Sequence, residues 1–280
     1  MADLAVPFET PSTRGQGTSR GVVRDALKEL RQGKCDDTRA TRALIDYSHS
    51  QMEGGEWRLP WTNSRTKTKL GEEDEKRMVL IAISLLLSRL IAAAATGRDF
   101  DKAKAYVGQA VQSLKQLEGK GSSQILDLSE STVAALLEIF TAIAHELILI
   151  KLLAQDSMVS RASATVHSRV AMYSYEQYTL ASSIAPKPVK IWLESRKQYT
   201  LAVCHLLVGR EQLALDNAGV AIAHFEVAKK EPSLSKQASE LMAEAKSANQ
   251  LLSFQQVPNV NNLTLPSGRC VVCFTGKEYF

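Results

Sequence analysis

The sequence predicts an all-α protein, and three observations support this prediction. Apolar residues recur at intervals of three and four through most of the chain, and capping residues, Gly or Pro mark the ends of these stretches. No stretch shows the alternation of apolar and polar residues that is typical of strands. With 280 residues, 45% of them hydrophobic, the chain can bury a core as one large domain or two small ones.

The first part of the chain predicts two amphipathic helices, over residues 19–33 and 36–52. The first ends at a glycine, and the second begins with a capping Asp and an acidic first turn. Residues 53–71 are rich in Gly, Pro, Trp and Thr. We therefore expect a small extended element near residues 55–70.

Four longer helices are expected next, over residues 72–97, 99–119, 129–155 and 157–184. Two of them contain apolar stretches long enough to resemble membrane spans, but these stretches include charged residues such as Arg89 and Glu146. A charge at the centre of a span costs about 2.5–3.5 kcal/mol. Both helices are therefore expected to be buried in the core of a protein that does not span a membrane.

Three more helices are expected, near residues 188–208, 210–230 and 233–254. The spacing of Gly209, Ala221, Phe225 and Ala228 resembles a tetratricopeptide helical hairpin. A weaker match of the same kind lies at residues 103–110. Since no 34-residue period runs through the chain, we expect one such hairpin inside another helical fold rather than a repeat array.

The chain shows no motif that would indicate an enzyme. Nucleotide-binding glycine loops, the nucleophile elbow and the zincin H-E-x-x-H motif are all absent from the sequence. His145-Glu146 is followed by Leu149 where the second zincin His would lie, so we interpret it as a polar pair at the edge of a packed helix. No catalytic residue, metal or cofactor is expected.

Four cysteines in a chain of this length do not indicate a disulfide framework, and no signal peptide is evident, so a cytoplasmic location with reduced thiols is expected. Cys270 and Cys273 form a C-x-x-C pair. Packing or chance is the favoured interpretation of this pair, with zinc binding, redox chemistry and lipid attachment as alternatives.

The net charge of +4 is too small and dispersed to indicate nucleic-acid binding.

Several segments together resemble the Bro-one domain family, the boomerang-shaped domain of Alix, Brox and rhophilin. The segments that carry the likeness occur in the family's order, and they are "VRDALKELRQG", "TRATRALIDYSHSQM", "LPWTNS", "EKRMVLIAISLLLSRLIAAAA", "DLSESTVAALLEIFTAIAHELILIK" and "ASELMAEAKSANQLLSFQQVPNVNNLTLPSG". The architecture is most similar to single-domain Brox. The resemblance implies a flexible N-terminus over residues 1–18, a helical domain over 19–258, and a tail over 259–280 that is packed on the domain or flexible.

The resemblance implies a non-enzymatic adaptor in endosomal sorting or membrane remodelling. Its partner would be the C-terminal amphipathic helix of ESCRT-III subunits, the charged multivesicular body proteins. The docking positions fall on Ile148 and Lys151 and, on the next helix, on Ala162 and Val166. Cytoplasmic location with recruitment to endosomal membranes would follow, with peripheral membrane association and with neither nucleic acid nor a small-molecule substrate as partner. The alternative is a helical scaffold that binds an unrelated partner through tetratricopeptide-like grooves.

Overall fold

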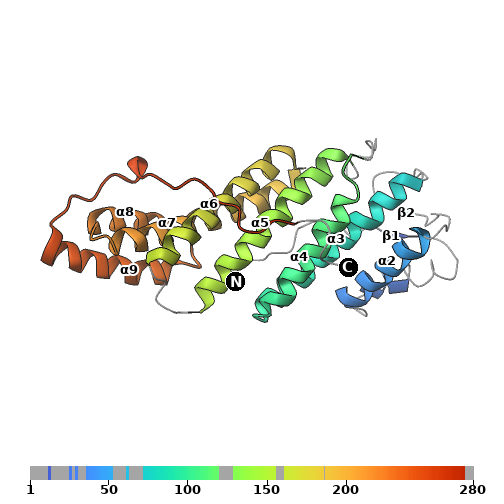
Figure 1. The fold of residues 1–280 in the computed structure, drawn as a ribbon, viewed down its shortest axis with the longest axis horizontal. Helices are drawn as coiled ribbons and strands as arrows, with labels where there is room; N and C mark the ends of the chain where they lie inside the picture. The colour runs from blue at the N-terminus through green and yellow to red at the C-terminus, as the bar shows by residue number, and fades with distance from the viewer. Residues whose placement is uncertain are drawn as a thin grey trace. The chain divides into compact units, whose positions relative to one another are not determined.

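The computed structural model describes residues 12–13, 25–26, 29–30, 36–52, 61–62, 72–119, 129–155, 161–185 and 187–274. These residues contain eight α-helices, shown in Figure 1, and this confirms the all-α prediction. The helices are α2 (Asp37–Met52), α3 (Glu72–Thr96), α4 (Phe100–Lys115), α5 (Glu130–Ala154), α6 (Arg161–Ile184), α7 (Lys187–Leu213), α8 (Ala218–Ala228) and α9 (Ser235–Ala248). A π-helical turn (Asn249–Ser253) continues α9, and a short 3₁₀ helix (Val260–Asn262) follows.

Two short strands pair in the N-terminal part of the chain. β1 (Ser12–Thr13) and β2 (Trp61–Thr62) are antiparallel, with Ser12 opposite Thr62. β2 lies inside the segment for which an extended element was expected. Most of the helix expected over 19–33, and the rest of residues 53–71, lie outside the described residues.

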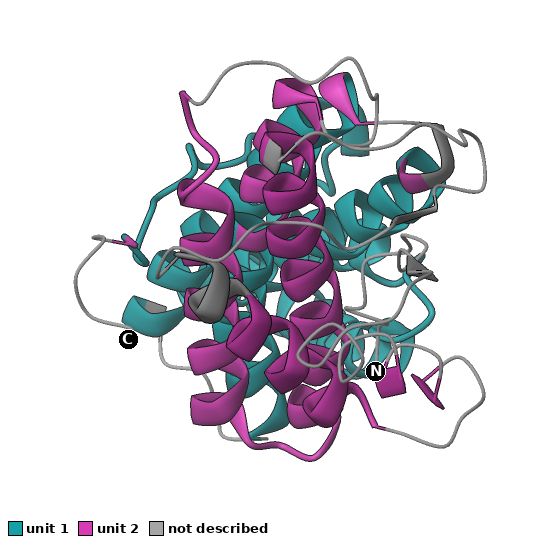
Figure 2. Ribbon diagram, turned by 90° about the vertical axis from the view of Figure 1, so that its right-hand side faces the viewer, with its two compact units in different colours: residues 1–2, 141–183, 190–273 teal, residues 3–140, 184–189, 274–280 magenta. Residues whose placement is uncertain are grey.

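The chain divides into two compact units, coloured in Figure 2. Unit 1 comprises residues 1–2, 141–183 and 190–273, and unit 2 comprises residues 3–140, 184–189 and 274–280. The boundary falls within α5 and close to the turn between α6 and α7. The four residues proposed from the sequence as a docking surface all belong to unit 1.

Unit 2 is built around α3, which packs against both α2 and α4. Buried polar side chains also join these helices. The Ser84 hydroxyl donates to the Leu80 carbonyl at 2.9 Å and approaches the Ala110 carbonyl of α4 at 3.2 Å, while the Tyr47 hydroxyl of α2 donates to Glu75 Oε1 of α3 at 2.7 Å. These contacts leave α3 buried along much of its length.

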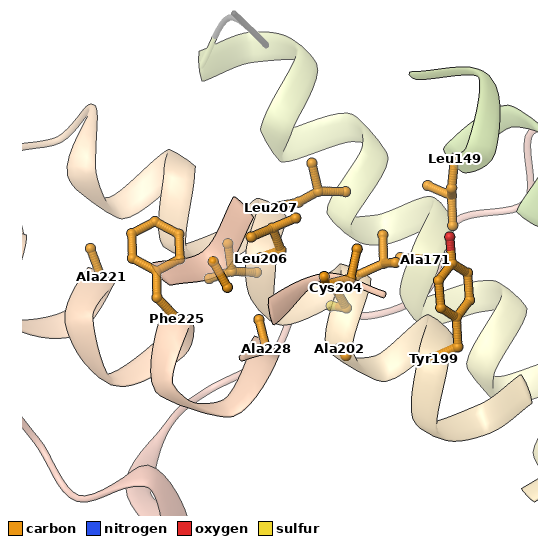
Figure 3. Close-up of a cluster of buried hydrophobic side chains, with 14 of the residues drawn as sticks. Leu149, Ala171, Tyr199, Ala202, Cys204, Leu206, Leu207, Ala221, Phe225 and Ala228 are labelled. Carbon is orange, nitrogen blue, oxygen red and sulfur yellow. The ribbon is translucent and has the colours of Figure 1, made fainter. Parts of the chain in front are cut away.

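The core of unit 1 contains the residues of the tetratricopeptide-like hairpin. Ala221, Phe225 and Ala228 of α8 are fully buried and pack with α7, as Figure 3 shows. A Cβ atom at Gly209 would lie 2.5 Å from Cε1 of Phe225, so only glycine fits beside this ring. The glycine therefore serves close helix packing.

The boundary between α7 and α8 that we expected from the sequence was wrong, because Gly209 serves helix packing and does not end a helix. We expected Gly209 to separate two helices, but α7 continues through it to Leu213, and the break lies at residues 214–217. Asp216 there has a positive φ of 61°, and the Asn217 amide donates to the Gln212 carbonyl at 2.9 Å, as the chain turns into α8.

Among the residues that the structure describes, two helices are long and apolar enough to cross a membrane by length and composition alone. They are residues Glu73–Thr96 of α3 and the whole of α5, and 78% and 72% of their most apolar windows are buried inside the fold. Their apolar side chains are therefore mostly in contact with other parts of this protein, as expected for core helices.

Candidate functional site

The proposed docking residues lie on the last turns of α5 and the first turns of α6. Ile148 is half-buried and Lys151 is exposed on α5, while Ala162 is exposed on α6. Val166 exposes 39% of its surface. All four side chains are thus at least partly open to solvent.

The opposite sides of the same helix turns belong to one hydrophobic core. Leu149 follows Ile148 and is fully buried, and Val170, one turn after Val166, is also buried in the same cluster. Figure 3 shows Leu149 and Ala171 beside Tyr199 of α7. The end of α5 and the start of α6 are therefore held on a shared core, with the candidate docking residues on their outer sides.

A polar contact fixes the start of α6. The Thr165 hydroxyl donates to Glu211 Oε1 of α7 at 2.6 Å, next to the exposed Val166. The Ser168 hydroxyl donates back to the Thr165 carbonyl at 2.9 Å. The first turns of α6 are thereby attached to the C-terminal end of α7.

A buried ion pair joins α5 to α7 close to the proposed docking residues. Glu146 is fully buried and pairs with Arg196 of α7, which is only 2% exposed. The Tyr178 hydroxyl of α6 donates to Glu146 Oε2 at 2.6 Å, and burial raises the pKa of Tyr178 well above its usual value. One carboxylate thus connects α5, α6 and α7 two residues before Ile148.

His145 attaches the C-terminal tail to α5. Its Nδ1 lies 2.7 Å from the Thr141 carbonyl, which can only accept, so Nδ1 carries the proton. Nε2 is then free to accept the backbone N–H groups of Val271 and Val272, at 3.1 and 3.3 Å. Burial lowers the pKa of His145, while the bond to Thr141 acts in the opposite direction, and the lowered pKa keeps the ring neutral.

The interpretation of His145-Glu146 as a polar pair at the edge of a helix was therefore wrong. Both residues are fully buried. His145 accepts a hydrogen bond from the Val271 backbone in the tail, and Glu146 pairs with Arg196 of α7. The signal in the sequence was the charge of Glu146 inside an apolar run, because a buried carboxylate requires a partner. Sequence spacing alone could not identify Arg196 as that partner.

A second group of exposed apolar residues follows α9. Leu251, Leu252 and Phe254 expose 72%, 81% and 79% of their surface, and Val257 exposes 41%. Phe254 has a positive φ of 49°, and its amide donates to the Asn249 carbonyl at 2.7 Å. This group was not singled out as a site from the sequence.

No cluster of three or more potential metal ligands occurs among the residues that the structure describes. A pair of histidines is another buried polar feature of unit 1. His205 of α7 and His224 of α8 are buried with their Nδ1 atoms 2.9 Å apart. Burial lowers the pKa of each to about 4, so both rings are neutral near pH 7, and one Nδ1–H donates to the other Nδ1.

Comparison with known proteins identifies the fold. No protein-family model matches this chain, and no curated protein sequence matches it significantly. Solved structures do match. ALIX in complex with the SIVmac239 PYKEVTEDL late domain has a TM-score of 0.68 at 16% identity, over 91% of this chain and 44% of that one.

Two further solved structures match over nearly their whole length. The complex of the ALIX Bro1 domain with CHMP4C has a TM-score of 0.70 at 15% identity, over 96% of this chain and 94% of that one. A structure described as the basis for endosomal targeting by the Bro1 domain has a TM-score of 0.69 at 14% identity, over 98% and 93%. This chain therefore has the fold of a Bro1 domain, as the resemblance to the Bro-one family predicted. It spans less than half of the longer ALIX chain.

Proposed function

We propose that this Bro1-fold protein is a non-enzymatic adaptor that binds the C-terminal amphipathic helix of an ESCRT-III subunit. The observation that carries the proposal is the match, over almost the full length of both chains, to a Bro1 domain solved with CHMP4C. At 15% identity the fold is shared but the docking residues must be argued from this chain itself.

We assign the docking surface to Ile148, Lys151, Ala162 and Val166. Its support is the combination of exposed apolar side chains and a fixed backbone. Ile148 and Val166 lie on helices whose inner sides are core, so their partial exposure leaves apolar area that a partner helix can bury. The buried ion pair of Glu146 and the half-buried hydrogen bond of Thr165 hold these turns in place before binding.

The chemistry of the four residues fits an amphipathic helix. The apolar face of the ligand would cover Ile148 and Val166, and Ala162 would let its backbone approach α6 closely. Lys151 would lie beside an acidic side chain on the polar edge of the ligand. A helix in a groove is recognised in this way, through a few apolar anchors with charges at the rim.

We place this adaptor in the cytoplasm, with recruitment to endosomal membranes through its partner. Support comes from the Bro1 domain whose structure was described as a basis for endosomal targeting. The helical domain expected over residues 19–258 would carry the docking surface.

The proposal is tested by titration of the full chain with peptides from the C-terminal helices of ESCRT-III subunits. Ile148→Asp should weaken binding by at least about 2 kcal/mol, roughly 30-fold in Kd, because it places a carboxylate in an apolar anchor position. Ile191→Asp is the matched control, since Ile191 is 82% exposed on α7. The proposal fails if no peptide binds at high micromolar concentration, or if the folded Ile148→Asp variant binds as tightly as Ile191→Asp.

A second candidate function is that of a helical scaffold for an unrelated partner. The exposed group Leu251, Leu252 and Phe254 favours it, because three large apolar side chains close together in sequence are rarely left open without a role. Under this alternative, Leu252→Asp would weaken partner binding while Ile148→Asp would not.

A further inference from the structure

The tail presents two cysteines close together on the surface. Cys270 and Cys273 are both exposed and reduced, and their Sγ atoms are 3.9 Å apart. The Cys270 thiol also approaches the Val272 carbonyl at 3.4 Å. The two sulfurs therefore lie close together, and only Val271 and Val272 separate the two cysteines in the sequence.

The segment that carries the two cysteines is held to the rest of unit 1. The N–H groups of Val271 and Val272 both donate to Nε2 of His145, whose other nitrogen donates to Thr141. The residues before Cys270 are also fixed to α6, because the Gly268 N–H donates to Glu176 Oε1 at 3.2 Å and the Arg269 N–H donates to the Arg169 carbonyl at 3.0 Å. A segment anchored in this way keeps the two thiols close together, and both are exposed to solvent.

We propose that Cys270 and Cys273 are a dithiol modification site, which small-molecule disulfides of the glutathione class convert reversibly to an intramolecular disulfide. The proposal is independent of ESCRT-III binding. A disulfide has an S–S bond of about 2.05 Å, so the sulfurs must approach by somewhat less than 2 Å. Because only two residues separate the cysteines in the chain, this approach involves one short segment.

The reaction follows thiol–disulfide exchange. The Cys270 thiolate attacks one sulfur of glutathione disulfide, forms a mixed disulfide and releases one glutathione thiolate. Cys273 then loses its proton and attacks the Cys270 sulfur, which breaks the mixed disulfide and releases the second glutathione. The chain loses two electrons and two protons, and both pass to the two glutathione molecules. Reduced glutathione reverses both steps.

The surroundings of the two exposed thiols differ from those of Cys204. The hydrogen bond with Cys270 and the charge of Cys270 raise the pKa of Cys273, so Cys273 keeps its proton to higher pH. By contrast, Cys204 is fully buried and burial raises its pKa to about 12, which makes it unreactive.

In the test, the reduced full chain is incubated with glutathione disulfide, and the reaction is stopped with acid. The remaining thiols are then alkylated, and the mass of the intact protein is measured by mass spectrometry. The wild-type chain should change from four alkylated thiols to two, with no glutathione retained, and peptide mapping should find Cys270 and Cys273 as the pair lost. Cys273→Ser should instead accumulate one glutathione on Cys270, because the second step cannot occur. Cys204→Ser should still lose two thiols.

Two results would overturn the proposal. One is a wild-type chain that keeps all four alkylated thiols in excess glutathione disulfide. The other is a wild-type chain that retains glutathione on Cys270 as stably as Cys273→Ser does, since the thiols would then not react with each other.

Discussion

The carboxylate of Glu146 pairs with the guanidinium of Arg196 inside the helical core, where α5, α6 and α7 meet. Neither side chain is accessible to solvent beyond a few per cent, and the Tyr178 hydroxyl donates to the same carboxylate. The Arg196 guanidinium also lies over the Tyr199 ring, 4.8 Å from its centroid. Because Ile148 follows Glu146 by two residues, this pair fixes the backbone on which the proposed docking surface stands.

Removing the cation should strongly destabilise the fold. Arg196→Met leaves the buried Glu146 carboxylate without its counter-charge, and we expect a loss of about 3–5 kcal/mol in the free energy of unfolding. Lys197→Met is the matched control, because the adjacent Lys197 pairs at 2.9 Å with Glu194, whose side chain is largely exposed. Such a pair contributes about 0–1 kcal/mol. Equal losses in urea denaturation for both variants would contradict the account.

A methyl group at Gly209 should destabilise the hairpin of α7 and α8. Alanine is favoured over glycine by about 1 kcal/mol inside a helix, but overpacking typically costs about 1–3 kcal/mol. Because the added Cβ would meet the Phe225 ring at 2.5 Å, we expect the clash to outweigh the helical preference. Thermal denaturation measures the result.

Two controls separate the clash from other effects. Gly97→Ala should be nearly neutral, since its Cβ would have no neighbour closer than 3.5 Å. Phe225→Leu should make a second change at Gly209 less costly than it is in the wild-type chain. A stabilising Gly209→Ala substitution would show that the packing described between α7 and α8 is incorrect.

The buried histidine pair should make the fold sensitive to acid. The pKa values of His205 and His224 are about 4 in the folded chain and about 6.5 when unfolded, so the unfolded state binds more protons between these values. The free energy of unfolding should therefore fall as the pH is lowered from about 6.5 to about 4. Urea denaturation across this range measures the slope. A double variant, His205→Gln with His224→Gln, should show a shallower slope, and an unchanged slope would exclude these residues as its source.

The charge of Lys151 should matter less than the apolar surface of Ile148. Lys151 is exposed, and exposed ion pairs contribute about 0–1 kcal/mol and are screened by salt. We expect Lys151→Glu to raise Kd for the ESCRT-III peptide by roughly fivefold at low salt, with the difference disappearing at high salt. Lys236→Glu on α9 is the control, because Lys236 is also exposed. A loss for Lys151→Glu that persists at high salt would indicate that Lys151 is buried in the complex.

Local sequence patterns were sufficient to predict most of the helices, because capping residues and apolar periodicity act within a single helix. The Asp99 side chain, for example, accepts the Lys102 N–H at the start of α4 as expected of a capping residue. Gly209 was misinterpreted because the ring that requires it belongs to the next helix. A glycine at a helix end and a glycine at a close helix contact look alike in sequence.

Local sequence patterns were also insufficient to predict the contacts of the candidate site. The positions of Ile148 and Val166 followed from the family resemblance, and periodicity alone would have made them core residues. The partners of Glu146 and His145 could not be predicted, because Arg196 and Val271 are 50 and 126 residues away in the chain. Long-range pairing of buried polar groups is a property of the fold, which local sequence does not encode.

Photo-crosslinking tests the central claim most directly, because it leaves the protein unchanged. A photoreactive residue is placed on the apolar face of an ESCRT-III C-terminal peptide, and the crosslinked positions in the full chain are mapped by mass spectrometry. The account predicts crosslinks on the last turns of α5 and the first turns of α6, around Ile148 and Val166, that excess unlabelled peptide removes. Competable crosslinks confined to other surfaces, such as Leu251 to Phe254, would contradict it.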